Sequence, residues 1–190
     1  MQKNKVKYGL SNAHYAKLTE GADGDTYDTP VPWPGAVQLT LTPKGEVVPF
    51  IADNREYWTA VGNAGYDGTF ECALVPESFR KDILGEVEDG NKILFERADV
   101  NPAYFALLFE FEGDAHKVKH VFYRCSASRP NIEGAATVNK EVKPTTLTFQ
   151  ARPNRDNLVK GNTKSDTLAA AADAWYAAVP VFSQAVVPEV

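Results

Sequence analysis

The stretch GTFECALVPESFRKDILGE, residues 68–86, predicts a β-strand that leads directly into a short helix. Phe70, Cys72 and Leu74 alternate with smaller or more polar residues, which is the period-two pattern of a half-buried strand. The stretch contains no recognisable catalytic motif. The pattern therefore indicates an architectural role, and the rest of the chain has to be searched for chemistry.

The second half of this stretch predicts a helix over about residues 77–84. Pro76 stands where the first helical residue tolerates proline, because its missing N–H has no partner there anyway. Phe79 and Ile83 are four residues apart, so they share one helical face and form an apolar stripe. Gly85 is a typical residue just past a helix end.

Composition predicts one globular domain over residues 1–190. Hydrophobic residues make up 44% of the chain and charged residues 24%, which is an ordinary globular balance. The formal net charge is −5, and acidic residues outnumber basic ones only in residues 1–95. Such a chain is a poor candidate for tight binding of nucleic acid phosphates.

The two cysteines, Cys72 and Cys125, both lie in strand-like runs. Two thiols in a chain of this size predict buried, reduced side chains rather than a disulfide scaffold. No apolar run approaches the roughly 20 residues of a membrane helix, and the N-terminal sequence has no apolar signal core. We therefore expect a soluble protein of a reducing compartment, with no membrane partner.

Several other segments alternate like strands. Val37, Leu39 and Leu41 predict a strand with one face toward water. Pro43–Gly45 predicts a turn, so that residues 46–51 would return as the second strand of a hairpin.

The run YFALLFEF, residues 104–111, is apolar on both faces for much of its length. This predicts a central strand covered on both sides, with residues 117–126 as its antiparallel partner. Residues 145–152 alternate again, with Leu147, Phe149 and Ala151 facing inward.

An alanine-rich segment predicts a C-terminal helix over about residues 168–178. Ser165 or Thr167 is suited to cap its start, and Pro180 to end it. The predicted fold is mainly β, an antiparallel β-sandwich or partly open barrel with this helix and the short helix of residues 77–84.

Two segments rich in glycine, proline or aromatic residues predict contacts with other molecules. One is an extended N-terminal arm or loop over about residues 1–35, and the other is a long loop over about residues 52–67. Long loops in compact domains are often functional, and aromatic residues are favoured in interface cores. The candidate contacts between subunits are Tyr27, Trp33, Tyr57, Trp58 and Tyr66. The alternative is that these segments fold back as lids over the sandwich.

No catalytic, cofactor-binding or metal-binding residue is predicted. His116 and His120 are spaced like helical metal ligands, but in a strand four residues span about 13 Å, too far for one ion. We interpret both as solvated histidines at a strand edge. Glu110 and Glu112 lie about 7 Å apart on one strand face, near a glycosidase spacing. They end a strand beside a turn, so a solvated acidic tip is the preferred interpretation, and the chain is predicted not to be an enzyme.

An ordered series of motifs resembles the major tail proteins (tail tube proteins) of bacteriophages, of the phi-thirteen type found in long, non-contractile tails. The motifs are TPVPWPGAVQLTL, PFIADNREYW, GYDGTFECALVPESFRKDILGE, FALLFEFEGD, RCSASRP and AWYAAVP. The resemblance extends from about Val6 to Pro180.

The resemblance implies a structural virion protein that self-assembles into stacked hexameric rings, the tail tube. Double-stranded DNA would pass through the channel without specific binding. The implied partners are further copies of the chain, a tape measure protein, and tail-terminator and distal tail proteins. The implied location is the virion tail, after assembly in the host cytoplasm. The alternative is another β-sandwich virion component, such as a tail-terminator or head–tail joining protein.

Overall fold

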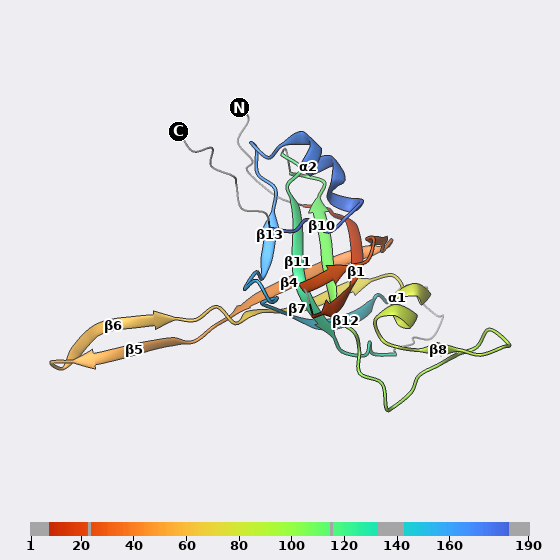
Figure 1. Ribbon diagram of the computed structural model, residues 1–190, viewed down its shortest axis with the longest axis horizontal. Helices are drawn as coiled ribbons and strands as arrows, with labels where there is room; N and C mark the ends of the chain where they lie inside the picture. Colours follow the sequence, from red (N-terminus) through yellow and green to blue (C-terminus); the bar gives the residue numbers. More distant parts are fainter. Residues whose placement is uncertain (1–7, 23, 115, 133–142, 183–190) are drawn as a thin grey trace.

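The computed structural model describes residues 8–22, 24–114, 116–132 and 143–182 (Figure 1). The chain is mainly β, with antiparallel strands and two short helices, as the sequence predicts. The first strands are β1 (Leu10–Gly21), β2 (Gly24–Tyr27), β3 (Val31–Pro32), β4 (Ala36–Lys44), β5 (Val47–Ala52), β6 (Arg55–Val61) and β7 (Gly65–Cys72). The remaining elements are α1 (Glu77–Asp82), β8 (Val87–Glu88), β9 (Leu94–Phe95), β10 (Phe105–Phe111), β11 (Lys119–Ala127), β12 (Thr145–Arg152), β13 (Lys160–Asn162), α2 (Ala169–Asp173) and the 3₁₀ turn η2 (Ala174–Tyr176).

One large sheet organises the molecule. Its strand order is β2-β1-β10-β11-β12-β7-β4, with β3 added beside β1 and β13 beside β11. The sheet curves until residues of β1 and β4 approach each other. No hydrogen-bonded ladder among the described residues closes it into a barrel. The result is a β-sandwich-like, open architecture.

The core lies on both faces of this curved sheet. The inner cluster gathers aromatic side chains, including Tyr15, Trp33, Phe79 and Phe105. The outer cluster is smaller, and Trp175 of the C-terminal segment covers it from outside. Because β10 contributes to both clusters, its first five residues are buried. This confirms the predicted central strand.

The strand–helix unit of residues 68–86 forms, although α1 ends at Asp82 and not near residue 84 as predicted. Phe70 and Cys72 are buried in β7, and Phe79 of α1 and Ile83 directly after it are buried in the inner cluster. Leu74 is an exception at 76% exposed, because β7 ends at Cys72 and the alternation no longer applies beyond it.

The predicted arm over about residues 1–35 is wrong for its described part. Leu10–Gly21 forms the twelve-residue strand β1, which pairs with β10 inside the sheet. Its pattern escaped recognition because Tyr15 and Ala16 are consecutive and both buried, on opposite faces of the sheet. A register shift between Ser11 and His14 disturbs the alternation further. Residues 1–7 and Asp23 lie outside the described residues.

The predicted hairpin of residues 37–51 and the predicted loop of residues 52–67 are also wrong. β4 pairs with β7, whereas β5 pairs with β6. Pro43 continues β4 instead of turning. An edge strand tolerates proline because the N–H that proline lacks needs no partner on the outer side of the sheet. The chain reverses ten residues later, at Asp53 and Asn54, whose φ angles are +53° and +57°.

The C-terminal helix is shorter than predicted. α2 covers five residues and continues into η2, and Leu168 occupies the N-cap without a side-chain hydrogen bond. Neither Ser165 nor Thr167 caps it.

The alternation predicted for residues 37–41 holds only in part. A register shift at Val37 leaves that side chain 55% exposed, although Leu39 and Leu41 face the inner cluster as expected.

Within the described part of the chain, no helix is long and apolar enough to cross a membrane.

Candidate assembly surfaces

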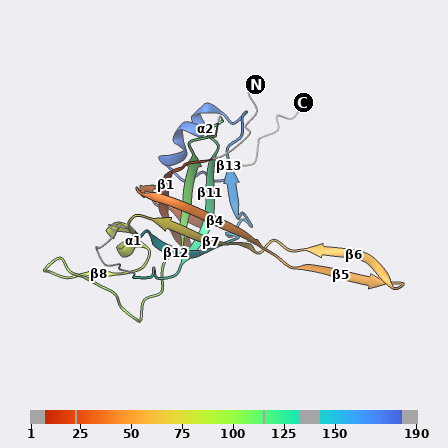
Figure 2. The ribbon, with the colours of Figure 1, turned by 180° about the vertical axis from the view of Figure 1, so that it is seen from behind.

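A long two-stranded ribbon projects from one end of the sheet (Figures 1 and 2). It begins as β4 paired with β7 and continues as β5 paired with β6. Bonds from Gly62 N–H to the Glu46 carbonyl (2.9 Å) and from Ala64 N–H to the Lys44 carbonyl (2.8 Å) join the two ladders. The hairpin turns at Asp53 and Asn54, which both have positive φ. This is the type I′ geometry, which matches the twist of a hairpin. The ribbon is therefore a regular hairpin built to extend outward.

The projecting β5–β6 hairpin exposes apolar side chains on both faces. On one face Phe50 lies opposite Trp58, and on the other Val47 lies opposite Val61. Phe50 is 57% exposed and Trp58 62%. Isolated two-stranded hairpins are marginally stable in water, and large exposed apolar patches mark interaction sites. Both faces of this hairpin are therefore candidates for burial against other molecules.

The five aromatic residues predicted as contacts fall into two groups. Tyr57, 68% exposed, and Trp58 lie on the hairpin, where a second molecule has access to them. Trp33 is 2% exposed; its ring packs against Phe70 and Phe79, so the alternative of a lid describes its position.

Tyr27 and Tyr66 are half-buried within the subunit. Burial raises the pKa of Tyr27 to about 12, and its ring lies 6.4 Å from that of Tyr123. The Tyr66 ring packs edge-on against Phe122 at 5.3 Å. The signal that sequence reasoning missed was the apolar run of β5, which adds Val47, Val48, Phe50 and Ile51 to the exposed surface.

Strand β4 forms an edge of the large sheet, and its outer face continues across β7 and β12 as a polar surface. The register aligns Thr40, Thr69 and Thr148 in one row. The flanking rows contain Gln38, Glu71 and Thr146 on one side and Thr42, Asp67 and Gln150 on the other. These nine positions include two carboxylates and no basic side chain, although Arg152 and Lys44 at the border contact Asp67 at 3.2 and 3.5 Å.

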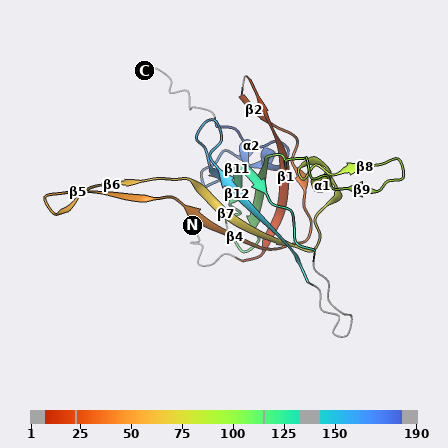
Figure 3. The same ribbon diagram turned by 90° about the horizontal axis from the view of Figure 1, so that it is seen from below.

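A second, smaller projection lies on the side of the molecule opposite the β5–β6 hairpin (Figure 3). Here β8 pairs with β9, and Val87 lies opposite Phe95, both about half exposed. The sequence search gave no sign of this projection, because its strands have only two residues each.

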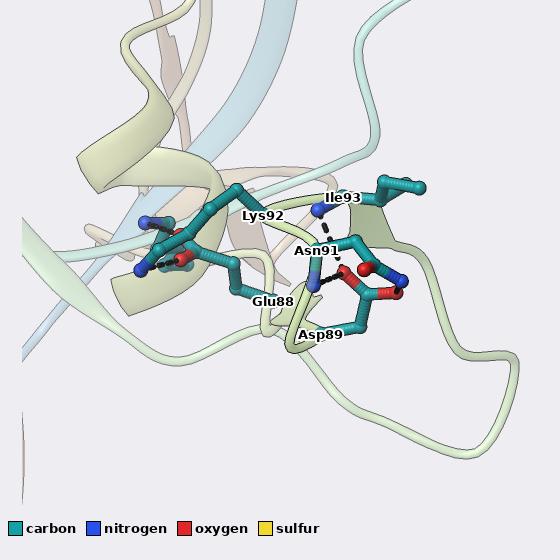
Figure 4. A network of polar contacts seen from close by, with 6 residues as sticks. Glu88, Asp89, Asn91, Lys92 and Ile93 are labelled. Carbon is teal, nitrogen blue, oxygen red and sulfur yellow. Dashed lines mark hydrogen bonds and ion pairs between the residues drawn. The ribbon is translucent and has the colours of Figure 1, made fainter.

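Charged groups tie this projection to α1 (Figure 4). Glu88 accepts hydrogen bonds from Lys81 and from Lys92, the latter at 2.6 Å. These bonds, first that of Lys81 and then that of Lys92, lower the pKa of Glu88 from its ordinary value near 4.5 to about 2. Asp89 accepts bonds from the N–H groups of Asn91 (2.8 Å) and Ile93 (2.9 Å). The turn is therefore held by side chains more than by its short ladder.

The side chains considered as possible catalytic or metal-binding groups do not form a common site. Among the described residues, no three His, Cys, Asp or Glu side chains are placed to hold a metal ion. His120 is half-buried and stacks on Phe109 at 5.1 Å, so the prediction of a solvated histidine is wrong for it. Glu110 accepts a bond from Asn12. Cys72 and Cys125 are buried and unpaired, as predicted; burial raises the pKa of both thiols.

No protein-family model matches this chain, and neither does any curated protein. Solved structures do match in fold. A chain from the cryo-EM structure of the anti-feeding prophage baseplate, 6-fold symmetrised, superimposes with a TM-score of 0.50 over 87% of this chain and 99% of that chain, at 8% identity. A chain from the anti-feeding prophage cap, the tube terminating cap, covers 86% of this chain and 96% of its own length at 9% identity, with a TM-score of 0.44. This chain thus shares the fold of a baseplate component.

Proposed function

We propose that this chain is a structural subunit of a phage tail, that it polymerises into stacked hexameric rings forming the tail tube, and that it is not an enzyme. The observation that carries the proposal is the β5–β6 hairpin, which exposes apolar side chains on two faces. The fold shared with a baseplate component supports the same class of protein. A tube built this way would lie in the virion tail after assembly in the host cytoplasm.

The physical reason is the cost of leaving the hairpin uncovered. Fully burying a large apolar side chain contributes about 1.5–3 kcal/mol relative to leaving it exposed. Phe50 and Trp58 are each more than half exposed in the subunit, so each contact that covers them gains part of this free energy. A contact between a projection on one copy and a different surface on the next is heterologous. Heterologous contacts generate rings or open filaments, as a tube of stacked rings requires.

The polar face of β4, β7 and β12 is our candidate for the channel wall. Asp67 and Glu71 belong to the acidic excess of residues 1–95, and a wall without free cations lets DNA pass without binding it. The free edge of β4 would pair with a neighbouring subunit, which removes an edge that otherwise invites aggregation. A ring structure with a net basic channel would overturn this part of the proposal.

Further partners follow from the resemblance in the sequence: a tape measure protein inside the tube, and tail-terminator and distal tail proteins at its ends. The second candidate function is a tail-terminator or head–tail joining protein. Such a protein would form single closed rings, because one of its faces must stop growth.

Electron microscopy of the purified chain, with sedimentation, tests the proposal. We expect long tubes; single closed rings would favour the second candidate, and a chain that stays monomeric at every concentration would contradict both.

A matched pair of variants tests the role of the hairpin. Replacing residues 47–61 by a two-residue Asn-Gly turn should leave the monomer folded by circular dichroism but abolish tubes, since β4 and β7 keep their own ladder. The control is Leu74→Ser, which removes an exposed apolar side chain outside the hairpin and should form normal tubes. Tubes from the shortened chain would rule out the hairpin as an assembly element.

A further inference from the structure

Two guanidinium groups lie on the outer face of the sheet, at the border of the polar surface of β4, β7 and β12. Arg124 of β11 and Arg152 of β12 are directly opposite each other in the ladder, so their side chains are neighbours on one face. Arg152 follows Gln150 by two residues and therefore lies on the same face as that surface. Each arginine side chain is 27% exposed. Guanidinium groups bind phosphate oxygens in a bidentate manner, so this pair has the chemistry of a phosphate site.

Each arginine is paired with a carboxylate from a different strand. Glu20 of β1 accepts a hydrogen bond from Arg124 Nη2 at 2.8 Å. Asp67 of β7 accepts one from Arg152 Nη2 at 3.2 Å. The second oxygen of Asp67 lies 3.5 Å from the Nζ of Lys44. Two carboxylates therefore hold three basic side chains at this border.

Further contacts fix both arginines without the carboxylates. The guanidinium of Arg124 lies over the Tyr104 ring, 4.0 Å from its centre. Arg152 donates to Oε1 of Gln150 at 2.8 Å and to the carbonyl of Ala64 at 3.2 Å. Removing the carboxylates would therefore leave two charged groups in place. Because like charges directly opposite each other repel, such a pair would attract an anion.

We propose that Glu20 and Asp67 mask a latent phosphate-binding pair, Arg124 and Arg152, and so keep double-stranded DNA from binding to this face. The inference rests on the proposed function, in which the adjacent polar surface lines the channel, and it names the residues that keep this wall from holding DNA. The unmasked pair would bind duplexes of any sequence, because contacts to phosphates carry no base information.

DNA binding by a double variant of the full-length chain tests the proposal. Glu20→Gln/Asp67→Asn keeps the shape of both side chains and removes their charge. Partly exposed ion pairs contribute little to folding, so circular dichroism should show a folded subunit. Fluorescence anisotropy of a labelled DNA duplex, measured at several salt concentrations, reports binding. We expect the variant to bind about tenfold or more tighter than the parent chain. The slope of log affinity against log salt should be about −2, since two phosphates are neutralised.

Two further variants serve as controls. Glu71→Gln/Glu112→Gln removes the same amount of charge, although neither of these carboxylates forms an ion pair with any described residue. This control should bind DNA no better than the parent chain. Adding Arg124→Gln and Arg152→Gln to the first variant should abolish the binding that it gained.

The outcomes separate this inference from the tube function. A first variant that binds DNA no better than the Glu71→Gln/Glu112→Gln control would overturn the masking, and so would binding that survives the loss of both arginines. Neither result bears on whether the parent chain forms tubes in the electron microscope. A parent chain that never assembles would overturn the proposed function whatever the DNA measurement gives.

Discussion

The inner core and the β5–β6 hairpin are both rich in aliphatic and aromatic residues, with opposite results. Phe79 in α1 is 0% exposed, whereas Phe50 in β5 is 57% exposed. The core is covered on each side by strands or helices from distant parts of the chain, while each strand of the hairpin pairs, among the described residues, only with the other. The difference shows that an apolar segment of sequence indicates a surface to be buried but does not indicate which molecule buries it.

A matched pair of Phe→Ala substitutions has the largest expected effect on the isolated subunit. Phe79→Ala should lower the free energy of unfolding by about 3–5 kcal/mol, because Phe79 packs against Tyr15, Trp33 and Phe105. Phe50→Ala should change it by less than about 0.5 kcal/mol. Urea unfolding of the monomer measures both. Equal losses would erase the contrast between core and hairpin.

A pair of glycine substitutions has a smaller effect. Gly85 lies three residues after the end of α1 with φ +74°, and a Cβ there would lie 2.4 Å from Val100 Cγ1. Gly85→Ala should therefore cost about 1–2 kcal/mol, the usual penalty for a left-handed residue with a side chain. Gly90→Ala, in the β8–β9 turn, has nothing within 4 Å and should stay within about 0.5 kcal/mol. Thermal unfolding compares them, and a Gly85→Ala protein as stable as the parent would refute the need for glycine at this left-handed position.

The smallest effect concerns the charged network at β8–β9. Lys81→Met should raise the pKa of Glu88 from about 2 toward 4.5, since Lys81 is the largest cause of its depression. Because the pKa is lowered in the folded state, its contribution to stability is present above about pH 4.5 and is lost as the pH falls through about 2. An NMR titration of the Glu88 carboxylate measures the shift. An unchanged midpoint would show that Lys81 does not hold this turn.

Sequence reasoning succeeded where burial is one-sided and the signals are local. The strand β12, with Leu147, Phe149 and Ala151 inward, and the helix anchored by Phe79 follow directly from periodicity. It failed where both faces are buried, as at Tyr15 and Ala16, and where an apolar strand has no core beneath it, as in β5 and β6. A groove of about 300 Å³ at the surface of the inner cluster had no sequence signal, because its lining comes from β4, β7, β10, β11 and β13.

The sequence by itself determined the β class, the central strand, the buried thiols and the start of the first helix, because these depend on neighbours two to four residues away. The tertiary structure decided that β4 pairs with β7 rather than with β5, that Trp33 is core while Trp58 is surface, and that the sheet stays open. Those outcomes depend on contacts between segments far apart in the chain. Local patterns indicate which side chains are apolar enough to be buried, and only the folded sheet determines which of them are buried within one subunit.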